Sequence, residues 1–123
     1  MRVSYAIVFV SDMSRSVSFY RDIVGLPLRF ESPGWTEFAT QGATLALHRS
    51  EEPGASRTEP RREPAGICRP GLSVPDLDDF HRRMIENKVR CIREPEENFG
   101  ARIAQYADPD GLAFSVGEDR AGT

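Results

Sequence analysis

A six-residue pattern occurs twice in this 123-residue chain and constrains its fold more than any other feature. At residues 8–13 (VFVSDM), an apolar run is followed by a short turn-like segment that ends in Asp and then by the start of a helix-like stretch. The same pattern occurs again at residues 72–77 (LSVPDL). The two Asp residues, Asp12 and Asp76, are 64 positions apart (76 − 12), about half the chain. A repeat with this period predicts two copies of one unit, which usually share a core and often a site.

The first copy has the element order β-α-β-β-β. Residues 3–10 are almost all apolar or aromatic, which predicts a buried strand. Asp12 is placed to cap a helix with apolar residues at helical spacing, and Gly25 followed by Pro27 ends that helix. Three further strands are expected at 28–30, 35–39 and 44–48.

The second copy repeats this order after a polar stretch. Strands are expected at 67–74, 89–93, 102–107 and 112–116, and Asp76 caps a helix that ends near Asn87. Between the copies, residues 50–66 are rich in Glu, Arg and Pro, which indicates a solvated linker or, alternatively, a ligand lid. We expect one domain over 1–123, made of repeats at about 1–49 and 67–117.

Composition excludes several classes of protein. No apolar run is long enough to cross a membrane, and the chain starts with a strand-like segment rather than a signal peptide. The net charge of −3 and the lack of a basic stripe argue against nucleic acid or an anionic membrane as a partner. Cys68 and Cys91 form neither a metal-binding nor a disulfide-rich pattern, so we expect a reduced, cytoplasmic protein.

The two repeated segments, with others named below, resemble those of the vicinal oxygen chelate superfamily, which includes glyoxalase I, bleomycin-resistance proteins and extradiol dioxygenases. The matching stretches are 10–12 with 19–26, then 72–77 and 108–111, and together they cover nearly the whole chain. The resemblance implies an α+β fold in which two βαβββ units form an open, barrel-like curved sheet around a cavity, with the helices outside. Bleomycin-resistance-like members usually combine two chains, so a homodimer is expected.

The same resemblance identifies the positions where a metal would be held. Metal-dependent members place His, Glu, His and Glu in strands one, four, five and eight, which correspond here to Tyr5, Ala46, Arg69 and Ser115. None of these is a good divalent ligand, so we expect no metal and no other cofactor. His48, two residues beyond Ala46, stays open as a displaced ligand, a general base, a hydrogen-bond donor to a ligand or a partly solvated edge-strand histidine near a loop.

Strand alternation separates a packing face from a pocket face. An almost wholly apolar set should pack against the helices: Ala6, Val8, Val10, Leu45, Leu47, Leu72, Val74, Phe114 and Val116. The opposite set mixes aromatic, small and polar side chains, as small-molecule pockets do: Tyr5, Ile7, Phe9, Ala46, His48, Arg69, Gly71, Ser73, Ala113 and Ser115. Trp35 and Tyr106 are further ligand-binding candidates, with Gln105 as the alternative to Tyr106, and Arg102 joins the rim.

Some of these residues have competing interpretations. Arg69 either receives a carboxylate, phosphate or enolate, or it is solvated or paired with an acidic residue such as Glu37. Trp35 either stacks on a flat ligand or belongs to the core or a dimer contact. Cys68 as a thiolate nucleophile is disfavoured because alternation turns it away from the pocket, and His81 is expected on the surface.

Three functions fit these features. The first is a metal-free binding protein that holds a small anionic or aromatic ligand. The second is an enzyme, related to the lyases, isomerases or dioxygenases of the superfamily, with a non-standard site around His48, Tyr5 and Arg69. The third is an interaction module with a vestigial cavity, which the polar-lined pocket disfavours.

Overall fold

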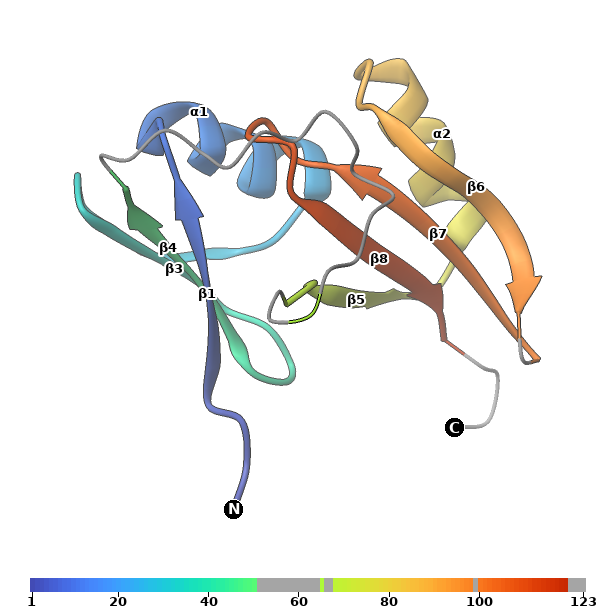
Figure 1. The fold of residues 1–123 in the computed structure, drawn as a ribbon, viewed down its shortest axis with the longest axis horizontal. Coiled ribbons are helices and arrows are strands. Elements are labelled where there is room, and N and C mark those ends of the chain that lie inside the picture. The colour runs from blue at the N-terminus through green and yellow to red at the C-terminus, as the bar shows by residue number, and fades with distance from the viewer. Residues whose placement is uncertain (51–64, 66–67, 99, 120–123) are drawn as a thin grey trace. The chain divides into compact units, whose positions relative to one another are not determined.

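The computed structural model describes residues 1–50, 65, 68–98 and 100–119 (Figure 1). The chain divides into two compact units, Met1–Ala55 and Ser56–Thr123, and each is described here by itself. Almost all of the expected linker or lid at 50–66 lies outside the described residues. The single domain over 1–123 stays a prediction.

The first unit has the predicted order, with a π-helical turn added. Its elements are β1 (Tyr5–Val10), α1 (Met13–Ser18), the π-helix η1 (Phe19–Val24), β2 (Leu28–Glu31), β3 (Trp35–Phe38) and β4 (Thr44–Arg49). The strands form one four-stranded sheet in the order β1-β4-β3-β2. β1 runs parallel to β4, and the other neighbours are antiparallel.

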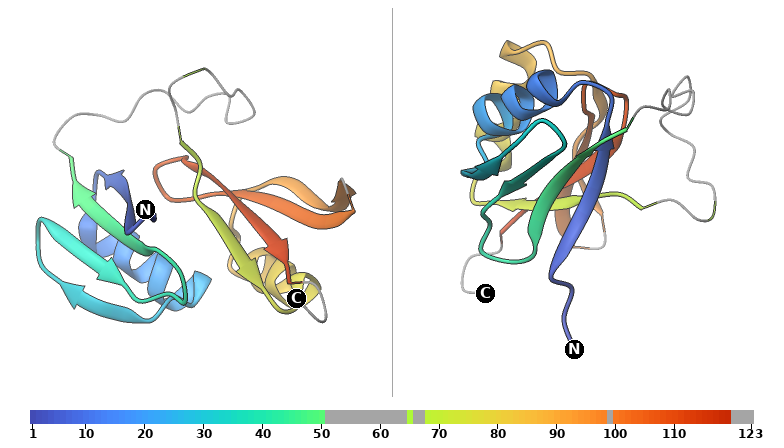
Figure 2. Two further views of the ribbon diagram at one scale, coloured as in Figure 1. Left: turned by 90° about the horizontal axis from the view of Figure 1, so that it is seen from below. Right: turned by 90° about the vertical axis from the view of Figure 1, so that its left-hand side faces the viewer.

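The helical segment of this unit covers one face of the sheet (Figure 2). Val8, Val10 and Leu47 are buried on that face, as alternation predicts. Tyr20 and Phe38 join them, with ring centroids 6.1 Å apart. Burial of these side chains is the main favourable contribution to the folding of the unit.

The expected single helix from 13 to 24 is instead an α-helix followed by a π-helix. Asp12 caps it as predicted, its Oδ1 accepting a hydrogen bond from the backbone N–H of Arg15 at 3.0 Å. At the far end, the N–H groups of Gly25 and Leu26 both donate to the carbonyl of Tyr20, at 3.1 and 2.9 Å. Gly25 has a φ of 98°, which glycine adopts without steric cost.

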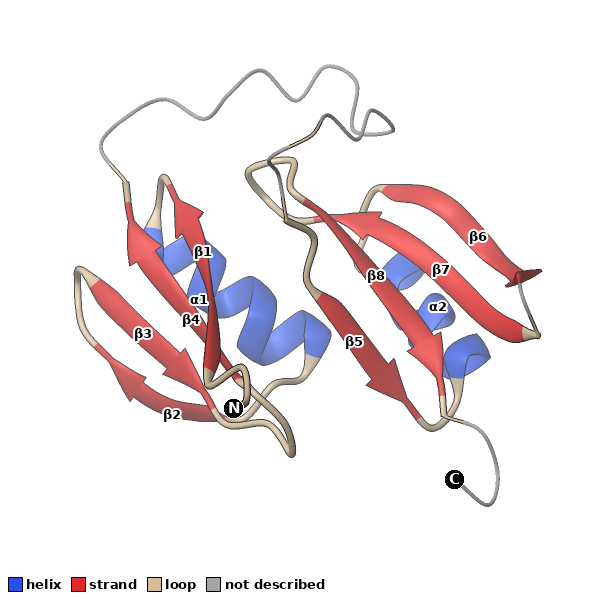
Figure 3. Cartoon of the chain, turned by 60° about the horizontal axis from the view of Figure 1, so that its bottom comes forward, coloured by secondary structure: helices blue, strands red, loops and turns tan. Residues whose placement is uncertain are grey.

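The second unit repeats the arrangement. Its elements are β5 (Gly71–Val74), α2 (Leu77–Glu86), β6 (Cys91–Asn98), β7 (Ala101–Ala107) and β8 (Ala113–Glu118), with strand order β5-β8-β7-β6. Its helix also lies on one face of its sheet (Figure 3). Asp76 accepts from the N–H of Asp79 at 3.0 Å, so both predicted caps are confirmed.

Several boundaries differ from the prediction, each for a local reason. β1 begins at Tyr5 because Val3 lies outside the sheet and is 75% exposed. β5 begins only after Pro70, which lacks a backbone donor. β6 extends beyond Arg93 through Pro95, which an edge strand tolerates at a register shift. Lys88, with a φ of 58°, takes the left-handed conformation after α2.

The α+β fold of two βαβββ units is therefore as predicted. Within the described residues, no helix combines the length and apolar character that crossing a bilayer requires.

Candidate functional site

The candidate site is the face of the first sheet that lies away from the helix, which we call the helix-free face. Register fixes its members: Ile7 of β1 and Glu37 of β3 both pair with Ala46 of β4, and Phe9 and Trp35 both pair with His48. Tyr5 lies two residues before Ile7, on the same face. Neighbouring strands therefore bring together the residues that the sequence predicted for the first half of the pocket.

Aromatic side chains form a continuous row on this face. Tyr5 and Trp35 have ring centroids 6.3 Å apart, Trp35 and His48 6.0 Å, and both pairs are nearly perpendicular at 89°. Phe9 and His48 continue the row at 5.3 Å. These separations are typical of favourable aromatic contacts. Trp35 is half-buried within this row, which is the position that the ligand-stacking interpretation requires.

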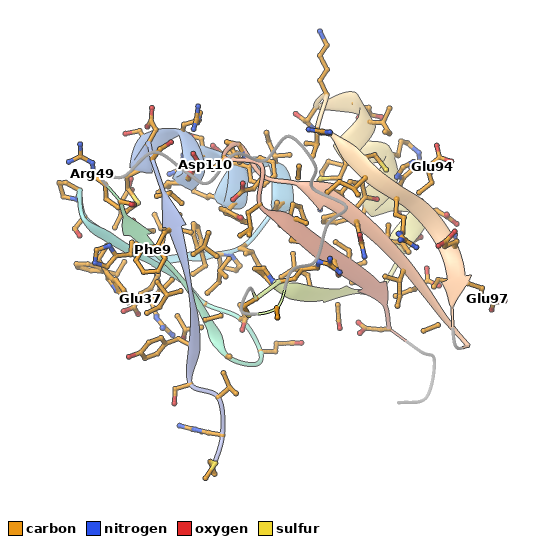
Figure 4. All side chains as sticks on the ribbon, in the orientation of Figure 1. Phe9, Glu37, Arg49, Glu94, Glu97 and Asp110 are labelled. Atoms are coloured by element: carbon orange, nitrogen blue, oxygen red, sulfur yellow. The ribbon has the colours of Figure 1, made fainter. Side chains whose placement is uncertain are left out.

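Large apolar side chains on this face are exposed. Tyr5 is 54% exposed, Ile7 41% and Phe9 63%, and Phe9 can be seen beside β1 in Figure 4. Ala46, which pairs with Ile7 and Glu37, is by contrast fully buried. A contiguous exposed apolar surface commonly marks a place where a ligand or partner binds.

Two charged residues of this face, Glu37 and Arg29, were not predicted as site residues, although Glu37 was considered as a possible partner of Arg69. The Glu37 carboxylate (Figure 4) accepts from the indole N–H of Trp35 at 2.8 Å and from Arg29 Nη2 at 2.8 Å. The hydrogen bonds from Trp35 and then from Arg29 hold the pKa of Glu37 below its usual range. A register shift in β2 brings Arg29 to this position, and short-range sequence patterns do not reveal such a shift.

His48 is exposed, but β4 lies between β1 and β3, so the edge-strand interpretation is wrong. Its Nδ1 lies 2.7 Å from the backbone carbonyl oxygen of Arg49, and a carbonyl can only accept, so Nδ1 carries the proton in this contact. In the neutral imidazole, Nε2 then remains as an acceptor. This arrangement suits a base or a hydrogen-bond partner for a ligand, and both interpretations of His48 stay open.

The predicted residues of the second unit occupy its corresponding strands. Ser73 is exposed on β5, and Ser115 of β8 pairs with Gly71 and is half-buried. Arg69 is half-buried just before β5. Their roles in ligand binding stay predictions.

Tyr106 requires a correction. It is fully buried between Phe80 of α2 and Phe114 of β8, at centroid distances of 5.7 and 5.8 Å. Tyr106 therefore lies beneath the helix, because it pairs with Phe114 of the apolar set, whereas Gln105 pairs with Ser115. Of the two candidates, Gln105 takes the helix-free position.

Arg102 and His81 also lie differently from expectation. Arg102 is bound to α2 through Asp78, with Nη2 2.9 Å from Oδ1, and lies 3.5 Å from Glu118, so it supports the helix side of the sheet. His81 is not a simple surface residue, because its Nδ1 lies 2.9 Å from the hydroxyl of Tyr106. Burial raises the pKa of Tyr106 far above its ordinary value, which makes the neutral phenol the partner of His81.

A polar hollow of about 620 Å³ lies elsewhere in the first unit. It is lined by the start of α1, the β2–β3 turn and Arg49 (Figure 4), with Glu31 and Ser32 among its walls. No ring of the aromatic row lines it. The helix-free face is the stronger candidate because it carries the aromatic side chains.

The residues present do not fit the metal centre of the resembling enzymes. The corresponding positions hold a phenol, a methyl group, a guanidinium and a hydroxyl, at Tyr5, Ala46, Arg69 and Ser115. A guanidinium cannot donate an electron pair to a cation, and neutral hydroxyls bind divalent metals weakly. Among the residues that the structure describes, no three His, Cys, Asp or Glu side chains gather as metal ligands would. The absence of a metal from the functional protein stays a prediction.

Comparison with known proteins gives consistent matches along the chain. The family model of the Glyoxalase/Bleomycin resistance protein/Dioxygenase superfamily matches residues 2–116. The phenazine antibiotic resistance protein EhpR of Enterobacter agglomerans is 32% identical over 113 residues, covering 89% of this chain and 86% of EhpR. The metallothiol transferase FosB of Staphylococcus haemolyticus is 30% identical over 103 residues, covering 83% and 72%.

Solved structures agree with these matches. A glyoxalase/dioxygenase from Nostoc punctiforme superposes with a TM-score of 0.83 at 22% identity, covering 97% of this chain and 91% of that one, and shows the fold alone. TnmS3, an antibiotic binding protein from Streptomyces sp. CB03234, superposes with a TM-score of 0.72 at 26% identity, covering 98% and 97%.

Proposed function

The chain belongs to the Glyoxalase/Bleomycin resistance protein/Dioxygenase superfamily, and on that premise we propose that it binds a small planar aromatic molecule on the helix-free face of its first sheet. Its relatives include proteins named for antibiotic resistance and antibiotic binding. The proposal makes this chain a binding protein of that kind, and it needs no metal.

The observation that carries the proposal is the exposed aromatic row. A soluble fold gains nothing from leaving Tyr5, Phe9 and Ile7 exposed side by side, since each prefers to leave water. A flat aromatic ligand would cover them and add ring contacts with Trp35. Tyr5 and His48 would keep their perpendicular contacts with the indole.

Recognition of an acidic group is a separate proposal, which concerns Arg69 in the second unit by itself. The guanidinium of Arg69 carries paired N–H donors suited to a carboxylate. Its predicted role is separable from that of the aromatic row, because a neutral aromatic molecule would need only the row.

A second candidate is a metal-independent enzyme that uses His48. It is favoured by the contact between His48 Nδ1 and the Arg49 carbonyl, which leaves Nε2 as an acceptor next to the aromatic row. The relative FosB is named a metallothiol transferase, but the side chains of this chain do not suit a metal centre. Turnover of a bound aromatic compound that Phe9→Ala and His48→Gln both abolish would favour the enzyme.

Binding can be tested with probes that separate aromatic from acidic recognition. Phenazine is the neutral planar probe, phenazine-1-carboxylate the acidic one, and cyclohexanecarboxylate the non-aromatic control. We expect calorimetry to detect both phenazines and not the control. Phe9→Ala should weaken both phenazines, and Arg69→Met should leave the affinity for neutral phenazine unchanged. Absence of heat with both phenazines, or unchanged affinity in Phe9→Ala, would overturn the aromatic proposal.

Native mass spectrometry of protein purified without added ligand tests the remaining expectations together. It reports a co-purified small molecule, a bound metal and the number of chains in one spectrum. We expect a metal-free homodimer. One tightly held Zn, Ni, Mn or Fe per chain, confirmed by elemental analysis, would contradict the metal-free proposal.

A further inference from the structure

We infer that Glu37 is a positioning residue: together with Arg29, it holds the indole of Trp35 in one orientation and so shapes the aromatic row before a ligand arrives. The consequence for ligand affinity rests on the proposed function. The orientation of Trp35 itself does not, and it can be measured without any ligand.

Trp35 and Glu37 contact each other through their side chains. They are two residues apart on β3, so both side chains leave the strand on the helix-free face. The indole Nε1–H donates to Glu37 Oε2 at 2.8 Å. An indole has only this one polar hydrogen, so Glu37 takes up the whole hydrogen-bonding capacity of the Trp35 side chain.

Glu37 is itself held in place by Arg29. Arg29 donates to Glu37 Oε1 from Nε at 3.2 Å and from Nη2 at 2.8 Å. Nη2 also donates to the hydroxyl of Thr44 on β4 at 2.6 Å. Arg29 of β2 and Trp35 of β3 therefore both donate to the Glu37 carboxylate, and Thr44 of β4 holds Arg29 in place.

A register shift between β2 and β3 brings Arg29 to Glu37. Leu28 pairs with Phe38, but Phe30 pairs with Glu37, so two steps along β2 match one step along β3. Arg29 is the additional residue in this shift, and its guanidinium reaches the helix-free face. A β-bulge commonly redirects a side chain in this way next to functional sites.

The magnitudes favour orientation over stability as the role of this cluster. The side chains of Arg29 and Glu37 are 47% and 30% exposed, and water screens an ion pair at such exposure. Hydrogen bonds to an ionised carboxylate are nevertheless short and directional. The cluster therefore contributes little to the free energy of unfolding but fixes the ring of Trp35.

A fixed ring affects binding because a ligand then does not have to order it. Trp35 is perpendicular to both Tyr5 and His48, and rotation of the indole would break both arrangements at once. Ordering one side chain on binding costs affinity, so loss of the Glu37 contact should weaken binding of a flat ligand roughly three- to tenfold.

The experiment uses Trp35 as its own reporter, since it is the only tryptophan in the chain. Time-resolved fluorescence anisotropy is compared between the wild type, Glu37→Leu and Glu37→Gln. The matched control is Glu31→Gln, a carboxylate on β2 that pairs with Thr36 rather than with Glu37. We expect a larger amplitude of fast indole motion in Glu37→Leu, an intermediate one in Glu37→Gln, and no change in the control.

Phenazine affinity is then measured for the same set of proteins. A three- to tenfold loss in Glu37→Leu, with the thermal midpoint close to that of the wild type, supports the inference. Unchanged anisotropy in both Glu37 variants would overturn it, as would greater indole motion with unchanged phenazine affinity. If the wild type does not bind phenazine, the proposed function fails, and the anisotropy alone decides whether Glu37 positions Trp35.

Discussion

Phe9 and His48 lie directly opposite each other on the parallel strands β1 and β4, with ring centroids 5.3 Å apart. The residue before Phe9 on the same strand, Val8, faces the helix and is almost fully buried. One short strand therefore supplies folding contacts from one face and a candidate binding surface from the other, and single substitutions should separate the two roles.

Phe9→Ala should weaken phenazine binding several-fold while changing the free energy of unfolding by no more than about 0.5 kcal/mol, because the ring is exposed. Val8→Ala is the matched control, and loss of its buried methyl groups should cost about 2 kcal/mol. Urea unfolding and calorimetry measure the two effects. The assignment of faces would be wrong if Phe9→Ala destabilised the protein as much as Val8→Ala.

The repeated Asp residues should contribute alike to stability. Asp12 and Asp76 each accept a hydrogen bond from the backbone N–H three residues later, at 3.0 Å in both cases. Asp12→Ala and Asp76→Ala should each lower the free energy of unfolding by about 1 kcal/mol, and the Asn variants should retain most of it. The exposed Asp119→Ala serves as the control. A neutral result for both caps in urea unfolding would show that they do not stabilise the helices.

The sequence repeat was sufficient to predict element order and both helix caps, because these depend on hydrophobic period and on local turn chemistry. It also predicted the helix-free set of β1, since strand alternation relates Tyr5, Ile7 and Phe9 directly. Alternation could not choose between Gln105 and Tyr106, because the phase of β7 depends on its pairing with β8 and not on its own composition. Arg29 was missed because a register shift in β2 is a tertiary property.

The buried phenol of Tyr106 should limit stability at alkaline pH. Burial raises the pKa of Tyr106 in the folded protein, whereas the unfolded chain ionises this group near its ordinary value of about 10. Above that pH the unfolded state binds fewer protons than the folded state, so the free energy of unfolding falls as pH rises. Urea unfolding between neutral pH and about pH 11 should show this fall.

Tyr106→Phe isolates the contribution of the hydroxyl. At neutral pH the variant should lose about 1 kcal/mol, because the hydrogen bond with His81 is removed. It should also show a shallower loss of stability above pH 10 than the wild type. Identical alkaline slopes for the two proteins would assign the alkaline loss to other groups.

Phenazine binding should depend on pH through Glu37 in the acidic range. Trp35 and Arg29 hold the pKa of Glu37 below its usual range, so the carboxylate and its indole contact persist at neutral pH and down through the ordinary carboxyl range. As pH falls through the lowered pKa, protonation weakens the bonds from Arg29 and Trp35, and affinity should fall. Glu37→Gln should lose this acidic step in affinity, and an acidic step of equal size in Glu37→Gln would exclude Glu37 as its source.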